Sequence, residues 1–192
     1  GVEKTRKFLI SDMDGKRLGW VVEDPKGHFG KTMLRQFLGA HRPFKATLQD
    51  IKGNILLHMA RPYTWFNSEI HVLNAQGDRL GYIERRCHAW KRRYNLYLGD
   101  EMFAKVREGV LSWDFSLKGK DGHFMGHISR RFRGALREAF TDTGKYIMEM
   151  ESIKDIHSSQ LYPMTISERA LMLAMLICID FDFFSPWSNP YG

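Results

Sequence analysis

The amino-acid sequence predicts a mainly β protein in which a closed β-barrel surrounds one apolar helix near the C-terminus. Two observations lead to this prediction. Several stretches alternate apolar and polar residues on both sides of a tight turn, and ten consecutive apolar residues run from Ala170 to Ile179. The chain has 192 residues, 43% of them hydrophobic and 27% charged, which suits one folded domain spanning residues 1–192.

Four stretches have the pattern of a β-hairpin, in which two alternating strands flank a short turn that contains glycine. Glycine suits such turns because it adopts positive φ without a steric penalty. The stretches are residues 8–19, 44–59, 69–83 and 111–128, with turn glycines at 15, 53, 77 and 122. Residues 94–108 are a candidate fifth pair. The uneven spacing of the turn glycines argues against a regular solenoid or propeller.

Two stretches break the alternation. Residues 30–44 carry apolar side chains at helical spacing and end near a glycine and a proline, so they predict a short helix. A second helix is expected from about Ile166 to Phe184. Either Thr165 or Ser167 can cap its N-terminus through the side-chain hydroxyl.

The apolar run of the second helix has two interpretations, a buried core helix or a membrane-inserting segment. A membrane span needs roughly 20 predominantly apolar residues, whereas ten residues make about 15 Å of helix. Charged residues bound the run, with Arg169 before it and Asp180 and Asp182 at its end. A short helix that is apolar all round is normally buried in protein, so the core interpretation is favoured.

The charge and cysteine content indicate an intracellular protein with an anionic partner. The formal net charge is +7 and the sequence pI is about 9.5, which favours phospholipid headgroups, nucleic acid or an acidic protein. The two cysteines are Cys87 and Cys178, and the second lies in the apolar run and should be buried. A disulfide framework is therefore not expected, and a reducing compartment is.

Two basic clusters are the strongest candidate binding features. One lies between Arg79 and Tyr94 and the other between Arg130 and Arg137, and both interleave aromatic residues with basic ones. This pattern suits the interface of an anionic membrane, and it also suits nucleic-acid phosphate. The third interpretation is an ordinary solvated surface without a binding role. The predicted lipid-binding residues are Arg85, Arg86, Trp90, Lys91, Arg92, Arg93, Arg130, Arg131 and Arg133.

Motifs that would indicate catalysis are not recognisable in the sequence. His123 and His127 are four residues apart on a predicted strand, which places them roughly 13 Å apart and too far to share a metal. The sequence has no Gly-x-Ser-x-Gly nucleophile elbow and no recognisable pair of catalytic carboxylates. We therefore predict that the protein is not an enzyme.

Three stretches resemble the phospholipid scramblase family. They are HRPFKATLQDIKGNILLHMARPY (residues 41–63), GHISRRFRGALREAFTDTGKYIM (126–148) and MTISERALMLAMLICIDFDFF (164–184). The similarity extends from about residue 8 to residue 185. The segments CHAWKRRYNLY and IDFDFFSPWS are most similar to the fungal, mitochondria-associated branch of the family.

The resemblance implies a tubby-like closed β-barrel of about twelve strands around the hydrophobic C-terminal helix. It also implies bidirectional, ATP-independent movement of phospholipids between membrane leaflets, often activated by calcium. The calcium segment of the family would begin at Asp142. Its next acidic position is Gly144 in this sequence, so Asp142 is a weak metal-site candidate and calcium an uncertain cofactor.

Alternatives remain open at the level of the sequence. The protein could be a soluble tubby-like sensor or adaptor that binds anionic lipid without moving it, or a nucleic-acid-binding protein that uses the same basic surface. The expected partners are an anionic phospholipid membrane and a second copy of the chain in a homo-oligomer. The expected location is at a mitochondrial membrane, with the cytoplasmic face of the plasma membrane as the alternative.

Overall fold

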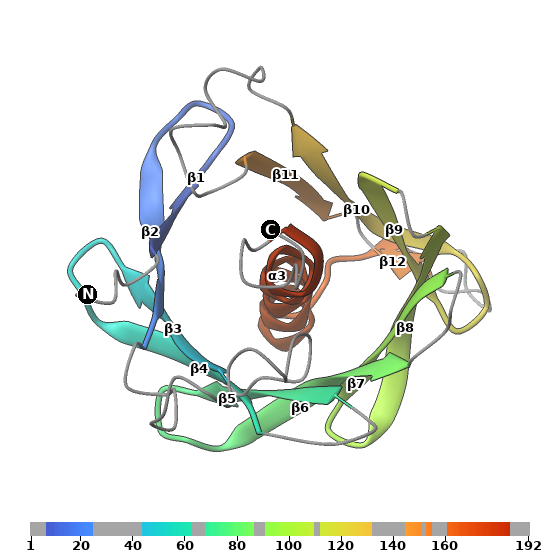
Figure 1. The fold of residues 1–192 in the computed structure, drawn as a ribbon, viewed down its shortest axis with the longest axis horizontal. Helices are drawn as coiled ribbons and strands as arrows, with labels where there is room; N and C mark the ends of the chain where they lie inside the picture. Colours follow the sequence, from blue (N-terminus) through green and yellow to red (C-terminus); the bar gives the residue numbers. More distant parts are fainter. Residues whose placement is uncertain are drawn as a thin grey trace, which may run out of the picture.

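The computed structural model describes residues 7–24, 44–62, 68–86, 91–109, 112–131, 145–150, 153–154 and 161–184. Within these residues, eleven antiparallel strands form one sheet whose spatial order follows the chain from β1 to β11. Figure 1 shows this sheet curving around a single helix, α3. The prediction of a mainly β fold around a C-terminal helix is confirmed.

The strands of the large sheet are β1 (Lys7–Ser11), β2 (Arg17–Glu23), β3 (Phe44–Asp50), β4 (Ile55–Arg61), β5 (Ser68–Asn74), β6 (Arg79–Arg86), β7 (Lys91–Leu98), β8 (Glu101–Gly109), β9 (Asp114–Gly119), β10 (Phe124–Arg131) and β11 (Lys145–Met150). A separate two-stranded sheet pairs β12 (Ile153–Lys154) with β13 (Leu161–Tyr162) ahead of the helix. The sequence pattern did not indicate this small sheet, because each of its strands has only two residues.

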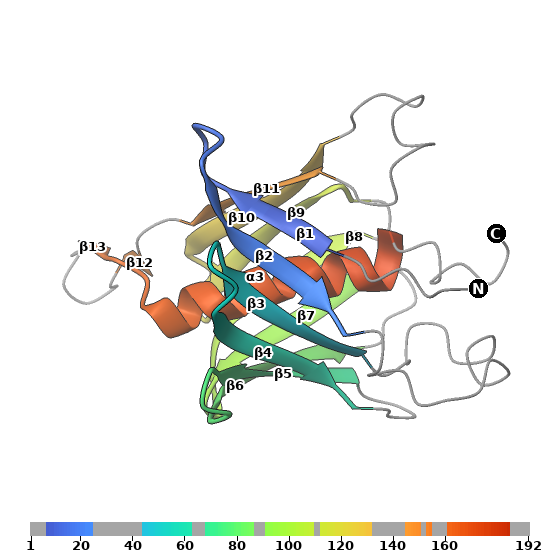
Figure 2. The ribbon, with the colours of Figure 1, turned by 90° about the vertical axis from the view of Figure 1, so that its left-hand side faces the viewer.

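The predicted hairpins are confirmed, including the fifth. The pairs are β1–β2, β3–β4, β5–β6, β7–β8 and β9–β10, with turn glycines at 15, 53, 77, 99 and 122 that all have positive φ. Since neighbouring strands are antiparallel, all five turns lie at one end of the sheet, which we call the turn end (Figure 2). The opposite end, where β6 ends at Arg86 and β7 begins at Lys91, is called the loop end.

The core helix follows the predicted boundaries closely. Helix α3 spans Ile166–Ile179, and its backbone continues as one π-helical segment, η3, over Asp180–Phe184. Thr165 is the N-cap, and it forms a capping box with Glu168 in which each side chain accepts a hydrogen bond from the backbone of the other. The predicted helix at residues 30–44 falls outside the described residues, apart from Phe44, with which β3 begins.

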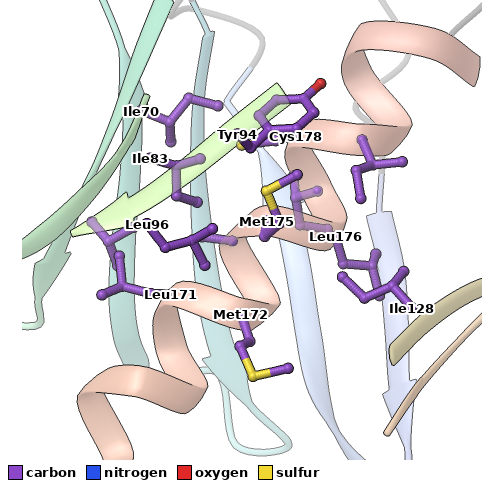
Figure 3. Packing of buried hydrophobic residues seen from close by; sticks show 14 of the residues in the cluster. Ile70, Ile83, Tyr94, Leu96, Ile128, Leu171, Met172, Met175, Leu176 and Cys178 are labelled. Atoms are coloured by element: carbon purple, nitrogen blue, oxygen red, sulfur yellow. The ribbon is translucent and has the colours of Figure 1, made fainter. Parts of the chain in front are cut away.

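The apolar run is buried inside the curved sheet. Every residue from Ala170 to Ile179 is buried except Leu173, which is half-buried. Inner-face side chains such as Ile83, Leu96 and Ile128 pack around the helix (Figure 3). The interpretation as a core helix is confirmed for this structure. Among the helices of the described residues, none has both the length and the apolar character needed to cross a membrane.

Glycine allows the sheet to approach the helix closely at β10. A Cβ built on Gly126 would lie 2.4 Å from the Met172 terminal methyl group and 2.6 Å from the Glu149 carbonyl oxygen. Real Cβ contacts are essentially never this short. The Met172 methyl group can turn away, but the Glu149 carbonyl belongs to the backbone, so a side chain here would push β10 away from β11. The close approach of these two strands depends on Gly126.

Closure of the sheet into a barrel remains a prediction. The recorded pairings run in order from β1 to β11, and no pairing joins these two edge strands among the residues described. In Figure 1 both edge strands lie beside the same helix. The structure therefore supports the coarser statement, a strongly curved antiparallel sheet around a buried helix.

Candidate functional site

Arginines gather at the loop end of the sheet. Arg61 ends β4, Arg85 and Arg86 end β6, Arg93 lies near the start of β7, and Arg107 lies near the end of β8. Each strand brings its own arginine to this end because neighbouring strands run in opposite directions. Successive side chains of a strand point to opposite faces, so the arginines divide into an inner and an outer group.

The inner group surrounds a carboxylate of the core helix. Arg61 Nη1 lies 2.6 Å from Asp182 Oδ1, and both side chains are only 1% exposed. Arg85 Nη1 lies 3.6 Å from the same oxygen, and the Tyr94 hydroxyl donates to Asp182 Oδ2 over 2.8 Å. The guanidinium of Arg61 also lies 5.2 Å from the ring centre of Phe181. We call Arg61, Arg85, Tyr94 and Asp182 the inner cluster.

A second helix carboxylate is held in a similar way from the other side. The Tyr146 hydroxyl, on β11, donates to Asp180 Oδ1 over 2.7 Å. Burial and the nearby Asp180 charge raise the pKa of Tyr146 well above its usual range, and Arg130 opposes this effect. Arg130 also lies 5.3 Å from the ring centre of Trp113. Sheet residues on both sides thus position the last turn of the helix.

These contacts offset the unfavourable electrostatic energy of two buried carboxylates at the C-terminal end of the helix. Carboxylates near the C-terminus of a helix face the negative end of its dipole, and burial adds a large desolvation penalty. Asp180 and Asp182 are 4% and 6% exposed, respectively. Arginine and tyrosine donors from the sheet compensate for both effects. The inner cluster therefore fixes the end of the helix to the sheet.

The inner cluster holds no activated nucleophile. Burial, and then the Asp182 charge, raise the pKa of the Cys178 thiol well above its usual value. The same two causes raise the pKa of the Tyr94 hydroxyl. Both groups are therefore neutral at physiological pH, and Tyr94 acts as a hydrogen-bond donor. Cys178 is 1% exposed, which confirms its predicted burial.

The outer group forms a row across three neighbouring strands. Arg86 pairs directly with Arg93 between β6 and β7, and Arg93 pairs directly with Arg107 between β7 and β8. Their neighbours Arg85, Tyr94 and Val106 point inward, so these three side chains point outward. We call Arg86, Arg93 and Arg107 the outer arginine row.

The three members of this row differ in their contacts. Arg86 Nε lies 3.1 Å from Glu84 Oε2, and its side chain is 59% exposed. Arg107 donates to the backbone carbonyls of Tyr94 and Val106 and to the side chain of Asn95. The Nε of the Arg93 side chain is buried and has no hydrogen-bond partner among the described residues.

The sequence-predicted site residues are thus only partly brought together. Arg85 and Arg130 contribute to the helix contacts, whereas Arg86 and Arg93 lie in the outer row. The backbones of Lys91, Arg92 and Arg131 lie in β7 and β10, and nothing is described of their side chains. Trp90, Arg133 and Asp142 lie outside the described residues.

Sequence reasoning did not select four residues that the structure brings to this end, although it named Tyr94 within the first basic cluster: Arg61, Tyr94, Arg107 and Asp182. Arg107 had a readable signal, because it follows the alternating apolar residues Ala104 and Val106 and so had to point outward. Asp182 was read only as a boundary of the apolar run. Its partner Arg61 is 121 residues away, so no local pattern could connect them.

Metal binding is not resolved by the described part of the chain. In that part, no group of three or more histidine, cysteine, aspartate or glutamate side chains could hold a metal ion. The calcium candidate Asp142 lies beyond it, so its role remains a prediction.

Comparison with known proteins gives a consistent result. The family model described as Scramblase matches residues 1–186. A phospholipid scramblase family protein of Schizosaccharomyces pombe is 33% identical over 96% of this chain and 55% of its own length. The "Altered inheritance rate of mitochondria protein 25" of Saccharomyces cerevisiae is 30% identical over 100% of this chain and 68% of its own length.

Mammalian relatives are more distant. "Phospholipid scramblase 1" of Mus musculus is 26% identical over 98% of this chain and 58% of its own length. The chain therefore spans between about half and two-thirds of the length of these relatives. No solved structure matches it.

Proposed function

The chain belongs to the scramblase family, and from this premise we propose that it promotes bidirectional, ATP-independent movement of phospholipids between membrane leaflets. The observation that supports the proposal best is the outward-facing row of arginines at the loop end. Each basic residue close to an anionic membrane contributes about 1 kcal/mol to binding. In this proposal the loop end docks on anionic lipid.

The docking surface includes more residues than the outer arginine row. We propose that Lys91, Arg92, Arg131, Arg133 and Trp90, which are close in sequence to the described loop-end strands, add to the same surface. Arg85 and Arg130 have a different part in this proposal, because they face the end of the core helix.

A direct test is transbilayer exchange of a fluorescent phospholipid. The protein is reconstituted in anionic vesicles that carry the labelled lipid, and a membrane-impermeant quencher is added, with and without calcium. Quenching well beyond the outer-leaflet fraction supports scrambling. Quenching that stops at that fraction while the protein stays bound would exclude scrambling under these conditions. The calcium arm, repeated with Asp142→Asn, tests the predicted calcium segment.

Docking can be tested separately by reversing the charge of the outward arginines. Replacement of Arg86 and Arg93 by Glu should abolish vesicle binding. Arg85 is left unchanged, because it faces Asp182 and its loss would disturb the core. The matched control reverses Arg17 and Arg79, which lie near the turn end, and should retain binding. Equal binding by both variants would show that the loop end is not the docking surface.

A second candidate function is lipid sensing without transport. One observation favours it: the most apolar segment of the chain packs inside the curved sheet, with its end fixed by Arg61 and Tyr94. In this state the protein presents basic side chains to a membrane but keeps its apolar helix covered. Vesicle binding without lipid exchange would support the sensor. Competition between anionic vesicles and duplex DNA, each at several salt concentrations, tests the nucleic-acid alternative.

We also propose a mitochondrial membrane as the site of action. The support is the name of the Saccharomyces cerevisiae relative, which refers to inheritance of mitochondria. Expression of the natural full-length protein with a C-terminal fluorescent tag tests this proposal. Co-localisation with a mitochondrial marker is the expected result. Labelling of the plasma membrane would contradict the mitochondrial proposal and favour the plasma membrane as the site of action.

A further inference from the structure

We infer that the outer arginine row, Arg86, Arg93 and Arg107, binds the phosphate of an anionic phospholipid and prefers a terminal phosphomonoester. This inference rests on the proposed membrane docking and makes it more specific. It replaces a diffuse basic surface with one site, and it adds Arg107, which the sequence analysis did not select.

The register places the three guanidinium groups within reach of one ligand. Directly opposite residues of an antiparallel pair have Cβ atoms about 4.5–5.5 Å apart. Arg93 is opposite Arg86 on one side and opposite Arg107 on the other, and all three point outward. Because the long arginine side chains extend well beyond this spacing, one phosphate group can accept hydrogen bonds from more than one of them.

The row carries an electrostatic conflict that an anion would relieve. Like charges directly opposite each other destabilise a sheet. Burial lowers the pKa of Arg107, and the neighbouring Arg93 and Arg86 charges lower it further. The carboxylate that opposes this effect is Glu84. Arg107 therefore faces two neighbouring positive charges and one neighbouring carboxylate.

Glu84 is already engaged by other groups. It accepts hydrogen bonds from Arg86, Asn95 and Tyr97, at 3.1, 2.9 and 3.3 Å. Although burial raises the pKa of Glu84, the hydrogen bonds from Arg86 and Asn95 lower it below its usual value. The carboxylate thus holds Arg86 in place and leaves the rest of the row to an external anion.

Arg93, at the centre of the row, carries a donor without a partner among the described residues. Its Nε is buried and has no hydrogen-bond partner among the described residues. Buried donors in folded proteins almost always have a partner. Arg86 and Arg107, on either side, have partners that fix their positions. The central side chain is therefore the one that a ligand can recruit without breaking an existing contact.

The chemistry of the row favours a phosphomonoester over a phosphodiester or a carboxylate. A phosphomonoester carries a charge of about −1.5 to −2 and three strong acceptor oxygens, and arginine binds such groups in a bidentate way. On the same outer face, the rings of Tyr82 and Tyr97 stack with their centres 4.4 Å apart. Aromatic rings beside basic residues are typical of the membrane interface. Since these two rings stack on each other, they favour a lipid surface over stacking with nucleic-acid bases.

Vesicle binding with a matched pair of variants tests the site. The full chain is mixed with vesicles that contain either phosphatidic acid, a phosphomonoester, or phosphatidylserine, at equal surface charge. We expect wild type to prefer phosphatidic acid. Arg93→Gln should weaken binding to those vesicles about tenfold and remove the preference. The control is Arg79→Gln, which should keep the preference. Arg79 is an exposed arginine of the same sheet, and it forms an ion pair with Asp100.

Thermal stability gives a second readout that does not involve a membrane. At low salt and without ligand, Arg93→Gln should melt at a higher temperature than wild type, because it removes the central like charge. Inorganic phosphate should stabilise wild type and not Arg93→Gln, since a ligand stabilises the state that binds it. A higher melting temperature also shows that the variant is folded.

The outcomes separate this site from the proposed transport. Equal losses for Arg93→Gln and Arg79→Gln, or equal losses on both vesicle types, would overturn the site in favour of diffuse attraction. Stronger competition by duplex DNA than by vesicles would assign the row to nucleic acid. A retained phosphatidic-acid preference without lipid exchange would overturn the proposed transport and support the site. Lipid exchange without a preference for phosphatidic acid would support the proposed transport and overturn the site.

Discussion

Arg61, the last residue of β4, donates to Asp182 in the final turn of the core helix over 2.6 Å, and both side chains are 1% exposed. This ion pair joins residues 121 positions apart. It lies where the helix leaves the sheet, and Tyr94 and Arg85 approach the same carboxylate. The pair fixes the depth of the helix in the sheet, because a shift along the helix axis would separate the two charges.

Asp182→Asn should destabilise the protein strongly. The substitution keeps the shape of the side chain and removes the negative charge that Arg61 and Arg85 face. Breaking a buried ion pair by neutralising one partner costs about 3–5 kcal/mol. The free energy of unfolding, measured with urea, should fall by this amount. The control is Asp100→Asn, whose pair with Arg79 is largely exposed and should contribute less than about 1 kcal/mol. Similar losses for both variants would contradict the assigned importance of the inner cluster.

Alkaline pH should destabilise the protein through its buried phenols and thiol. Burial, and then the Asp182 charge, raise the pKa values of Tyr94 and Cys178 above the unfolded values of 10.0 and 9.0. The unfolded chain therefore loses these protons first. The stability that the protonated groups contribute is complete below about pH 9 and falls as the pH rises above it.

The measurement is the free energy of unfolding at several pH values from about 7 to 11. Tyr146, whose pKa is raised by burial and then by Asp180, should add to the decline above its unfolded pKa of 10.0. Tyr146→Phe should therefore show a shallower decline than wild type in that range. A stability curve that stays flat to the highest pH, or that rises, would contradict the buried and protonated state of these groups.

Thr165→Ala should cost about 1 kcal/mol, the typical value for the loss of an N-cap. The Thr165 hydroxyl accepts the backbone N–H of Glu168, and the Glu168 carboxylate accepts the backbone N–H of Thr165. Ser167→Ala is the matched control, because Ser167 was the other cap candidate in the sequence and lies inside the helix in the structure. A larger loss of stability for Ser167→Ala than for Thr165→Ala would contradict the assignment of Thr165 as the N-cap.

The comparison of sequence and structure shows which information is local. The hairpins and the capping box depend on residues close in the sequence, and both could be predicted from alternation, turn glycines and cap chemistry. Arg85 and Arg86 are consecutive, so the alternation of a strand predicts that their side chains point to opposite faces of the sheet. It did not show which of the two points inward.

That choice depends on a distant carboxylate. Arg85 points inward because the curved sheet brings β6 beside the last turn of the helix, where Asp182 lies. Curvature and closure arise from the twist of the whole sheet, and no short sequence pattern encodes them. For the same reason, the strand pairing and the core helix could be predicted, but the closure of the barrel and the membership of the inner cluster could not.

Ala174→Asp should prevent folding. Ala174 lies in the middle of the core helix, is 1% exposed and packs inside the curved sheet. A carboxylate at this position would be buried among apolar side chains without a charged partner, which costs several kcal/mol and is comparable to the whole stability of a domain. We expect insoluble protein, or a soluble chain without a cooperative melting transition. The matched control is Ile166→Asp in the first turn of the same helix, where the side chain is 87% exposed and a carboxylate suits the helix N-terminus. A soluble Ala174→Asp protein with a cooperative transition near that of wild type would show that the helix leaves the sheet in solution, and it would favour a membrane-inserting role for this segment.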